Sequence, residues 1–192
     1  MKKNIPFDLL NHEIKKIKKN LDIISKFRIK NFDKLCFKAL KAIKGGNKII
    51  FFGNGGSASD AQHLAAELVV KYKKKRKPIP AISLSTDTSI ITSISNDFDY
   101  KSVFSRQIEA IGKKNDIAIA ITTSGNSNNL IEAIKTANKL KLKTFCFSGN
   151  KGGRLKKFVN YPILLPGKTT SVTQVLEITI GQIFCEYLES QI

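Results

Sequence analysis

The sequence contains no tryptophan, one methionine at its first position, and only two histidines. Cysteine is scarce as well, with Cys36, Cys146 and Cys185 far apart in the chain and each in an apolar stretch. An odd number of widely separated cysteines argues against a disulfide framework and against a cysteine-rich metal cluster. We therefore expect three buried thiols, which are typical of a reducing compartment.

Long hydrophobic runs are also absent from the sequence. No apolar stretch approaches the roughly 18 residues that a membrane-spanning helix requires. The start, Met1-Lys2-Lys3-Asn4, leads into an amphipathic segment without the apolar core of a signal peptide. We expect a cytoplasmic protein with no membrane partner. Its 192 residues fit one compact domain with an added helical arm.

Acidic residues are few, since 15 Asp and Glu face 33 Lys and Arg and leave a net charge of +18. Nucleic-acid binding is one interpretation of this charge. However, only four basic residues are arginine, the side chain that supplies bidentate base and phosphate contacts, and the lysines are scattered. We favour a compositional bias that attracts anionic substrates, with no specific nucleic-acid partner. The basic run 73–77 is interpreted as a solvated loop.

The first part of the chain has the periodicity of helices. Its apolar positions recur at alternating spacings of four and three residues, which draws a single stripe along one helix face, formed by Leu10, Ile14, Ile17, Leu21 and Ile24. A second helix is predicted over 32–44 and ends at Gly45-Gly46-Asn47. We assign residues 1–46 to a helical hairpin used for oligomerisation and residues 47–192 to the main domain.

Beyond residue 47 the pattern changes to short, continuous apolar runs separated by helical segments. Such runs are typical of strands that are buried on both faces. The predicted strands are 49–52, 79–84, 117–121, 144–147 and 163–165, and the predicted helices are 59–70, 89–95, 101–111, 128–140, 153–158 and 171–189. Alternating strands and helices predict an α/β fold with a doubly wound parallel sheet.

Two loops follow predicted strands directly and lead into helices. Residues 53–59 read Gly-Asn-Gly-Gly-Ser-Ala-Ser, and residues 122–127 read Thr-Thr-Ser-Gly-Asn-Ser. Glycines allow backbone amides to turn inward, hydroxyls donate hydrogen bonds to anions, and a helix start adds free N–H groups. The alternative is a pair of tight turns whose polar residues cap helices. Because two such loops occur at the ligand-binding edge of a parallel sheet, we favour a phosphate ester as ligand. Neither loop has the spacing of a Walker or dinucleotide motif.

The helix that follows the first loop carries His63 and Glu67. Four residues apart, they lie on the same helical face. An imidazole and a carboxylate there suit half of a metal site or an acid–base pair, although the same spacing is common in surface contacts. The other histidine, His12, is interpreted as a solvated or interface residue.

Several segments together resemble the SIS-domain phosphoheptose isomerase family, the sedoheptulose 7-phosphate isomerases. The resemblance covers nearly the whole chain and is carried by residues 52–63, 95–98, 103–107, 123–127 and 149–153. It implies a five-stranded parallel sheet, the SIS fold, and a homotetramer with active sites between subunits.

The resemblance also implies roles for individual residues. The phosphate would be held by Ser57, Thr122, Thr123, Ser124 and Ser127. Asn54, Asp97 and Gln174 would contact the substrate, and Glu67 would move a proton between C1 and C2 through an enediol. Zinc is bound in some members through residues that match His63, Glu67, Gln174 and Gln182.

The last helix departs from the family pattern. Gln182 stands where the family has a histidine that is both a metal ligand and an acid–base partner, and glutamine cannot titrate. Ser171 and Lys71 replace a family Asp and Arg. Three accounts follow: Glu177 takes over the acid–base role, Glu67 acts alone, or the chain is a non-catalytic SIS protein that binds a phosphosugar or another protein.

Taken together, these features predict an aldose–ketose isomerase. The expected reaction converts sedoheptulose 7-phosphate to D-glycero-D-manno-heptose 7-phosphate, for lipopolysaccharide or capsule heptose. The alternatives are a non-catalytic binding homologue and an isomerase of another sugar phosphate.

Overall fold

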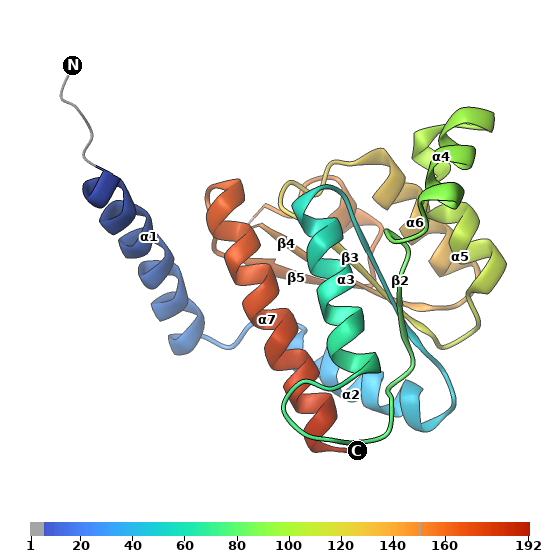
Figure 1. The fold of residues 1–192 in the computed structure, drawn as a ribbon, viewed down its shortest axis with the longest axis horizontal. Helices are drawn as coiled ribbons and strands as arrows, with labels where there is room; N and C mark the ends of the chain where they lie inside the picture. Colours follow the sequence, from blue (N-terminus) through green and yellow to red (C-terminus); the bar gives the residue numbers. More distant parts are fainter. Residues whose placement is uncertain (1–5, 150) are drawn as a thin grey trace.

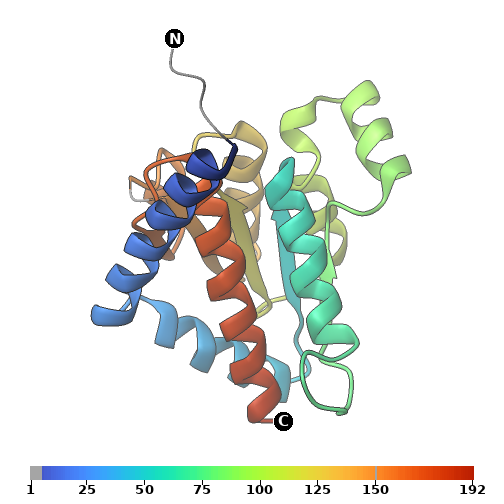
Figure 2. The same cartoon turned by 60° about the vertical axis from the view of Figure 1, so that its left-hand side comes forward.

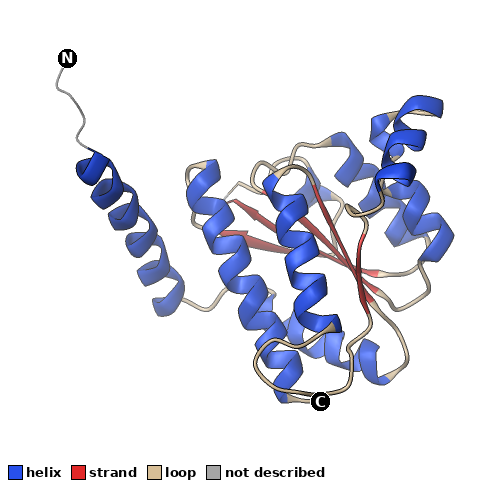
Figure 3. Ribbon diagram, viewed as in Figure 1, coloured by secondary structure: helices blue, strands red, loops and turns tan. Residues whose placement is uncertain are grey.

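The computed structural model describes residues 6–149 and 151–192. The basic start of the chain and Asn150, which belongs to the 149–153 segment, lie outside these residues. In the described part, seven α-helices and two short 3₁₀ helices surround one sheet (Figure 1, Figure 3). None of these helices is long and apolar enough to cross a bilayer.

The sheet is parallel throughout and has the strand order β2-β1-β3-β4-β5. Its strands are β1 (Ile49–Gly53), β2 (Ala81–Ser83), β3 (Ile117–Thr122), β4 (Lys143–Gly149) and β5 (Tyr161–Leu165). The predicted five-stranded doubly wound sheet is therefore confirmed. After β1 the chain forms β2 at one edge of the sheet, whereas after β3 it forms β4 and β5 toward the other edge. The crevice between β1 and β3 is thus the switch point at which such folds bind ligands.

Helices cover both faces of the sheet. One layer contains α2 (Phe32–Lys44), α3 (Gly56–Val69) and α7 (Thr170–Ser190), and the other contains α4 (Thr88–Asp97), α5 (Ser105–Ile111) and α6 (Asn128–Lys139). Strand β3 contributes side chains to both cores. Its isoleucines 117, 119 and 121 face the first layer, and its alanines 118 and 120 face the second. Burial on both faces explains why β1, β3 and β4 read as continuous apolar runs.

Helix α1 (Pro6–Lys26) has no buried residue and stands beside the main body next to α7 (Figure 1, Figure 2). Ile17 and Ile24 pack against the core, whereas Leu10 and Ile14 are 55% and 51% exposed. Helix α2, by contrast, places Leu35 and Ala39 in the core. The apolar stripe of α1 is thus only partly covered within this chain.

Two predicted helices differ in the structure. The segment 101–111 is divided into a 3₁₀ turn (η1, Tyr100–Ser102) and α5, because Val103 and Phe104 turn inward into the core between them. The segment 153–158 is reduced to a 3₁₀ turn (η2, Leu155–Lys157). Gly152 and Gly153 both have positive φ, which prevents a helix from starting there.

The basic run 73–77 is mostly exposed, as predicted, but Arg76 is not solvated. Its guanidinium donates hydrogen bonds to the carbonyls of Glu67 and Leu68 at 2.8 and 2.7 Å and lies 3.3 Å from the Glu189 carboxylate. Arg76 therefore fixes this loop to the C-terminal ends of α3 and α7.

The three cysteines are free and buried, as predicted. Burial raises the pKa of the Cys36 and Cys146 thiols to about 12.

Candidate functional site

The two loops singled out in the sequence lie next to each other, because β1 and β3 are neighbours in the sheet. Gly53 ends β1 at a point where no side chain fits. A Cβ at this position would lie 2.6 Å from the carbonyl oxygen of Ser57 and 2.9 Å from that of Ile121. The glycine therefore allows the turn into α3 to pass close to the end of β3.

The loop after β3 is organised by its own hydroxyls. Thr122 Oγ1 accepts a hydrogen bond from the Gly125 amide at 3.1 Å, and Ser124 Oγ accepts one from the Asn126 amide at 3.3 Å. Ser127 occupies the N-cap position of α6, yet its side chain makes no capping hydrogen bond. Its hydroxyl remains available to a ligand at the start of the helix.

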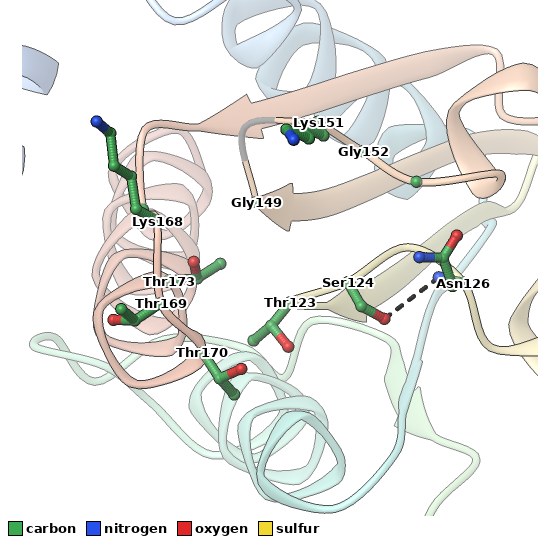
Figure 4. A pocket seen from close by; sticks show the side chains of 12 residues that line it. Thr123, Ser124, Asn126, Gly149, Lys151, Gly152, Lys168, Thr169, Thr170 and Thr173 are labelled. Carbon is green, nitrogen blue, oxygen red and sulfur yellow. Dashed lines mark hydrogen bonds between the residues drawn. The ribbon is translucent and has the colours of Figure 1, made fainter.

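A cavity of about 630 Å³ opens beside this loop, between the ends of β3, β4 and β5 (Figure 4). Hydroxyl and amide side chains from the 122–127 loop and from the start of α7 line one side, and the glycine-rich segment after β4 lines the other. The lining residues are Thr123, Ser124, Asn126, Gly149, Lys151, Gly152, Gly153, Gly167, Lys168, Thr169, Thr170 and Thr173. Ser57, Thr122 and Ser127, the other predicted phosphate ligands, are on the adjoining loops but do not line this cavity.

The loops after β3 and β4 are packed backbone against backbone. A Cβ on Gly125 would collide with the carbonyl of Gly152, and one on Gly153 would collide with the carbonyl of Ser124. Arg154 adds a side-chain contact, since its guanidinium donates to the Asn126 carbonyl at 2.7 Å. The sequence signal for this packing was the glycine pair of the 149–153 segment.

On α3, the Nε2 of His63 lies 2.8 Å from Oε1 of Glu67. Their side chains are 46% and 20% exposed, so the pair faces the surface beside α7. Gln174 packs against Gly56 at the start of α3, where a Cβ would collide with its amide nitrogen. Gln182 is half-buried two turns further along α7.

These four residues form a poor donor set for zinc. Zinc sites use three or four imidazole, thiolate or carboxylate ligands, whereas only His63 and Glu67 belong to these classes. Gln174 and Gln182 contribute amides. In the described residues, no group of three or more His, Cys, Asp or Glu side chains is arranged to hold a metal ion. The set does not fit a tetrahedral zinc site.

Glu177 is fully buried between α7 and the sheet. Both of its carboxyl oxygens and Oδ2 of Asp60 have no hydrogen-bond partner among the described residues. Burial, followed by the negative charge of nearby Asp60, raises the pKa of Glu177 to about 9. Glu177 is therefore a neutral acid at pH 7, and it does not line the cavity.

The two predicted sugar contacts lie on the other side of the switch point. Asn54 exchanges hydrogen bonds with Asn129 at 3.0 and 2.8 Å and accepts one from the Tyr100 hydroxyl at 3.0 Å. Sequence reasoning missed Asn129 and Tyr100, which lie far from Asn54 in the chain. Asp97 is exposed and lines a different cavity, formed by α4 and α5.

Comparison with protein families gives a match to the SIS domain over residues 14–149. The phosphoheptose isomerase of Aquifex aeolicus is 48% identical over 151 residues, which cover 79% of each chain. That of Clostridium acetobutylicum is 44% identical over 153 residues, which cover 80% of this chain and 78% of the relative.

Solved structures agree with this match. The phosphoheptose isomerase of Neisseria gonorrhoeae superposes with a TM-score of 0.91 at 29% identity, and covers 97% of this chain and all of its own. A phosphoheptose isomerase from Francisella tularensis gives a TM-score of 0.88 at 27% identity over 97% of this chain. The SIS match ends at residue 149, before α7.

Proposed function

The chain belongs to the SIS domain family and is a relative of the phosphoheptose isomerases, and we propose that it interconverts sedoheptulose 7-phosphate and D-glycero-D-manno-heptose 7-phosphate. One observation carries the proposal. The hydroxyl-lined cavity and the hydrogen-bonded His63–Glu67 pair lie on segments that start at the same switch point of the sheet. The phosphate would be held in the cavity, and the helix that carries the His63–Glu67 pair starts after the neighbouring strand β1.

Phosphate binding assists the reaction because it holds the substrate through a group that is far from the reacting carbons. Ser124 and Thr123 line the cavity, and the unused hydroxyl of Ser127 and the start of α3 at Ser57 lie on adjoining loops. Neutral donors and helix N-termini suit a phosphate ester. Fixing the phosphate orients C1 and C2, so binding energy from a remote group lowers the barrier to proton transfer.

Glu67 is the proposed base. It removes a proton from C1 of the ketose and later delivers this proton to C2, while a second proton is transferred from O1 to O2, so that the enediol forms and then collapses to the aldose. The same atoms are present in substrate and product, so no oxidant is required. His63, bonded to Glu67, orients the carboxylate. Glu177 is the second candidate for the acid–base role, and its neutral carboxyl would act as a proton donor.

No step in this mechanism is assigned to zinc, because the donor set around His63 does not fit that ion. We further propose a homotetramer in the cytoplasm. The uncovered apolar stripe of α1 supports the assembly, and the three buried free thiols support the location. Asp97 would contact the sugar only across a subunit boundary, since it lines a separate cavity within its own chain.

The test is proton exchange at C1. Purified protein is incubated with sedoheptulose 7-phosphate in deuterium oxide, and the C1 and anomeric signals are followed by NMR. We expect loss of the C1 proton signal and appearance of the aldose, with neither in Glu67→Gln. Binding of the sugar phosphate without exchange would support the non-catalytic alternative, which Gln182 favours because it removes a titrating group.

A further inference from the structure

The cavity beside the 122–127 loop has charge of one sign only. Among the described residues that line it, the charged side chains are Lys151 and Lys168, and no Asp or Glu is present. Neither lysine forms a salt bridge with a carboxylate in the described part of the chain. Both are exposed, so the two positive charges face solvent at the mouth of the cavity.

The lysines come from two separate loops that the backbone holds in place. Lys168 follows Gly167, where a Cβ would collide with the hydroxyl of Thr173, so the loop is pressed against the start of α7. Lys151 precedes Gly152, whose amide closes a turn on the Gly149 carbonyl at 2.9 Å. In Figure 4, Lys151 and Lys168 lie on the side of the opening away from Thr123 and Ser124, and the Lys168 side chain extends outward from it. Both lysines are thus attached to loops whose glycines pack closely against neighbouring groups.

The floor of the cavity, in contrast, offers only neutral donors. Thr123, Ser124 and Asn126 provide hydroxyl and amide groups, and these do not neutralise a phosphate that carries two negative charges. A cleft lined by charges of one sign raises the local concentration of ions of the opposite sign and speeds their capture. The hydroxyls would therefore fix the position of the phosphate, whereas the lysines would supply the positive charge that attracts it.

We propose that Lys151 and Lys168 form a cationic rim that captures the dianionic phosphate of the substrate and selects phosphorylated over neutral sugars. This inference rests on the proposed function for the identity of the sugar, but not for the recognition of phosphate. The lysines act on binding and not on proton transfer, because they lie on the phosphate side of the site and not on α3. The rim effect weakens as salt screens the charges.

The test uses Lys151→Met, Lys168→Met and the double variant, with Lys157→Met as control. Lys157 is an exposed lysine on η2 outside the cavity, so its loss matches the change in net charge. Thermal unfolding verifies that each variant folds. Binding of inorganic phosphate is measured by calorimetry at two salt concentrations, and KM and kcat are measured with sedoheptulose 7-phosphate.

We expect each rim variant to raise the phosphate Kd and the KM about three- to tenfold with kcat unchanged, and the double variant to lose most of the salt dependence. Lys157→Met should match the wild type. An equal loss of phosphate affinity in Lys157→Met, or an unchanged phosphate Kd in the double variant, would refute the proposed rim. A wild type that binds phosphate through the rim but does not turn over the sugar phosphate would leave the rim standing and overturn the proposed function.

Discussion

Arg154 holds Asn126 from two directions: its backbone amide donates to Oδ1 of Asn126 at 3.0 Å, and its guanidinium donates to the Asn126 carbonyl at 2.7 Å. The same guanidinium reaches Oδ1 of Asn128 at 2.7 Å. Arg154 thus connects the loop after β4 to the end of the 122–127 loop and to the start of α6.

Replacing Arg154 by methionine should loosen the 122–127 loop. Two guanidinium hydrogen bonds are lost, so we expect phosphate affinity to fall by about 1–2 kcal/mol while the fold persists. Calorimetry with inorganic phosphate measures the change. Arg106→Met is the control, because Arg106 stacks on Phe98 away from the cavity. Equal affinity in wild type and Arg154→Met would remove this role.

Ser124→Ala tests the floor of the phosphate site. A hydrogen bond to a charged group is lost, and the substrate should bind about 1–3 kcal/mol more weakly. Ser190→Ala, exposed at the C-terminal end of α7, is the matched control and should bind as the wild type does. Unchanged calorimetric affinity for Ser124→Ala would contradict the assignment of this loop.

Glu177→Gln tests the buried acid. The pKa of Glu177 is about 9 in the fold against an ordinary value of 4.5, so the folded chain retains a proton that the unfolded chain releases. This group therefore lowers stability as pH rises between those values. Between pH 5 and pH 8, the free energy of unfolding of Glu177→Gln should rise relative to that of the wild type by about 1–3 kcal/mol, as measured by denaturant unfolding.

The same variant decides the role of Glu177 in turnover. Loss of C1 proton exchange in a Glu177→Gln protein that folds normally would assign the acid–base role to this carboxyl. A stability gain that is the same at pH 5 and pH 8 would show instead that the buried group is ionised.

Gln182→His on α7 adds a third strong ligand to His63 and Glu67 on α3. We expect zinc affinity to rise at least about tenfold, as detected by cobalt absorption and by metal content after dialysis. Turnover should also rise within the roughly 10²–10⁴-fold range of acid–base catalysis. Gln62→His, an exposed control on α3, should alter neither quantity. Stoichiometric zinc in the wild type would contradict the conclusion that this donor set does not fit zinc.

The exposed stripe on α1 predicts an assembly. Leu10→Ser combined with Ile14→Ser should shift the particle mass from a tetramer to smaller species in light scattering, because both side chains are more than half exposed within one chain. Lys18→Ser on the same helix should leave the mass unchanged. A wild-type monomer at micromolar concentration would refute the assembly.

The sheet could be predicted because its central strands are buried on both faces and therefore read as unbroken apolar runs, as Ile117 to Ile121 do. The 122–127 loop could be predicted because its residue types suit anions wherever they occur. Lys168 and Arg154 could not be placed at the cavity in this way, since their roles depend on which loops the strand order brings together. The environment of Glu177 was likewise hidden, because a glutamate on a predicted helix gives no sign that its side chain faces the sheet.

The glycine contacts between the loops after β3 and β4 restrict how this site can be redesigned. Since Gly125, Gly152 and Gly153 leave no room for a side chain, neither loop can accept a larger residue at these positions without displacing the other. Engineering for a different phosphorylated sugar should therefore keep both loops unchanged and vary segments that lie outside the anion pocket.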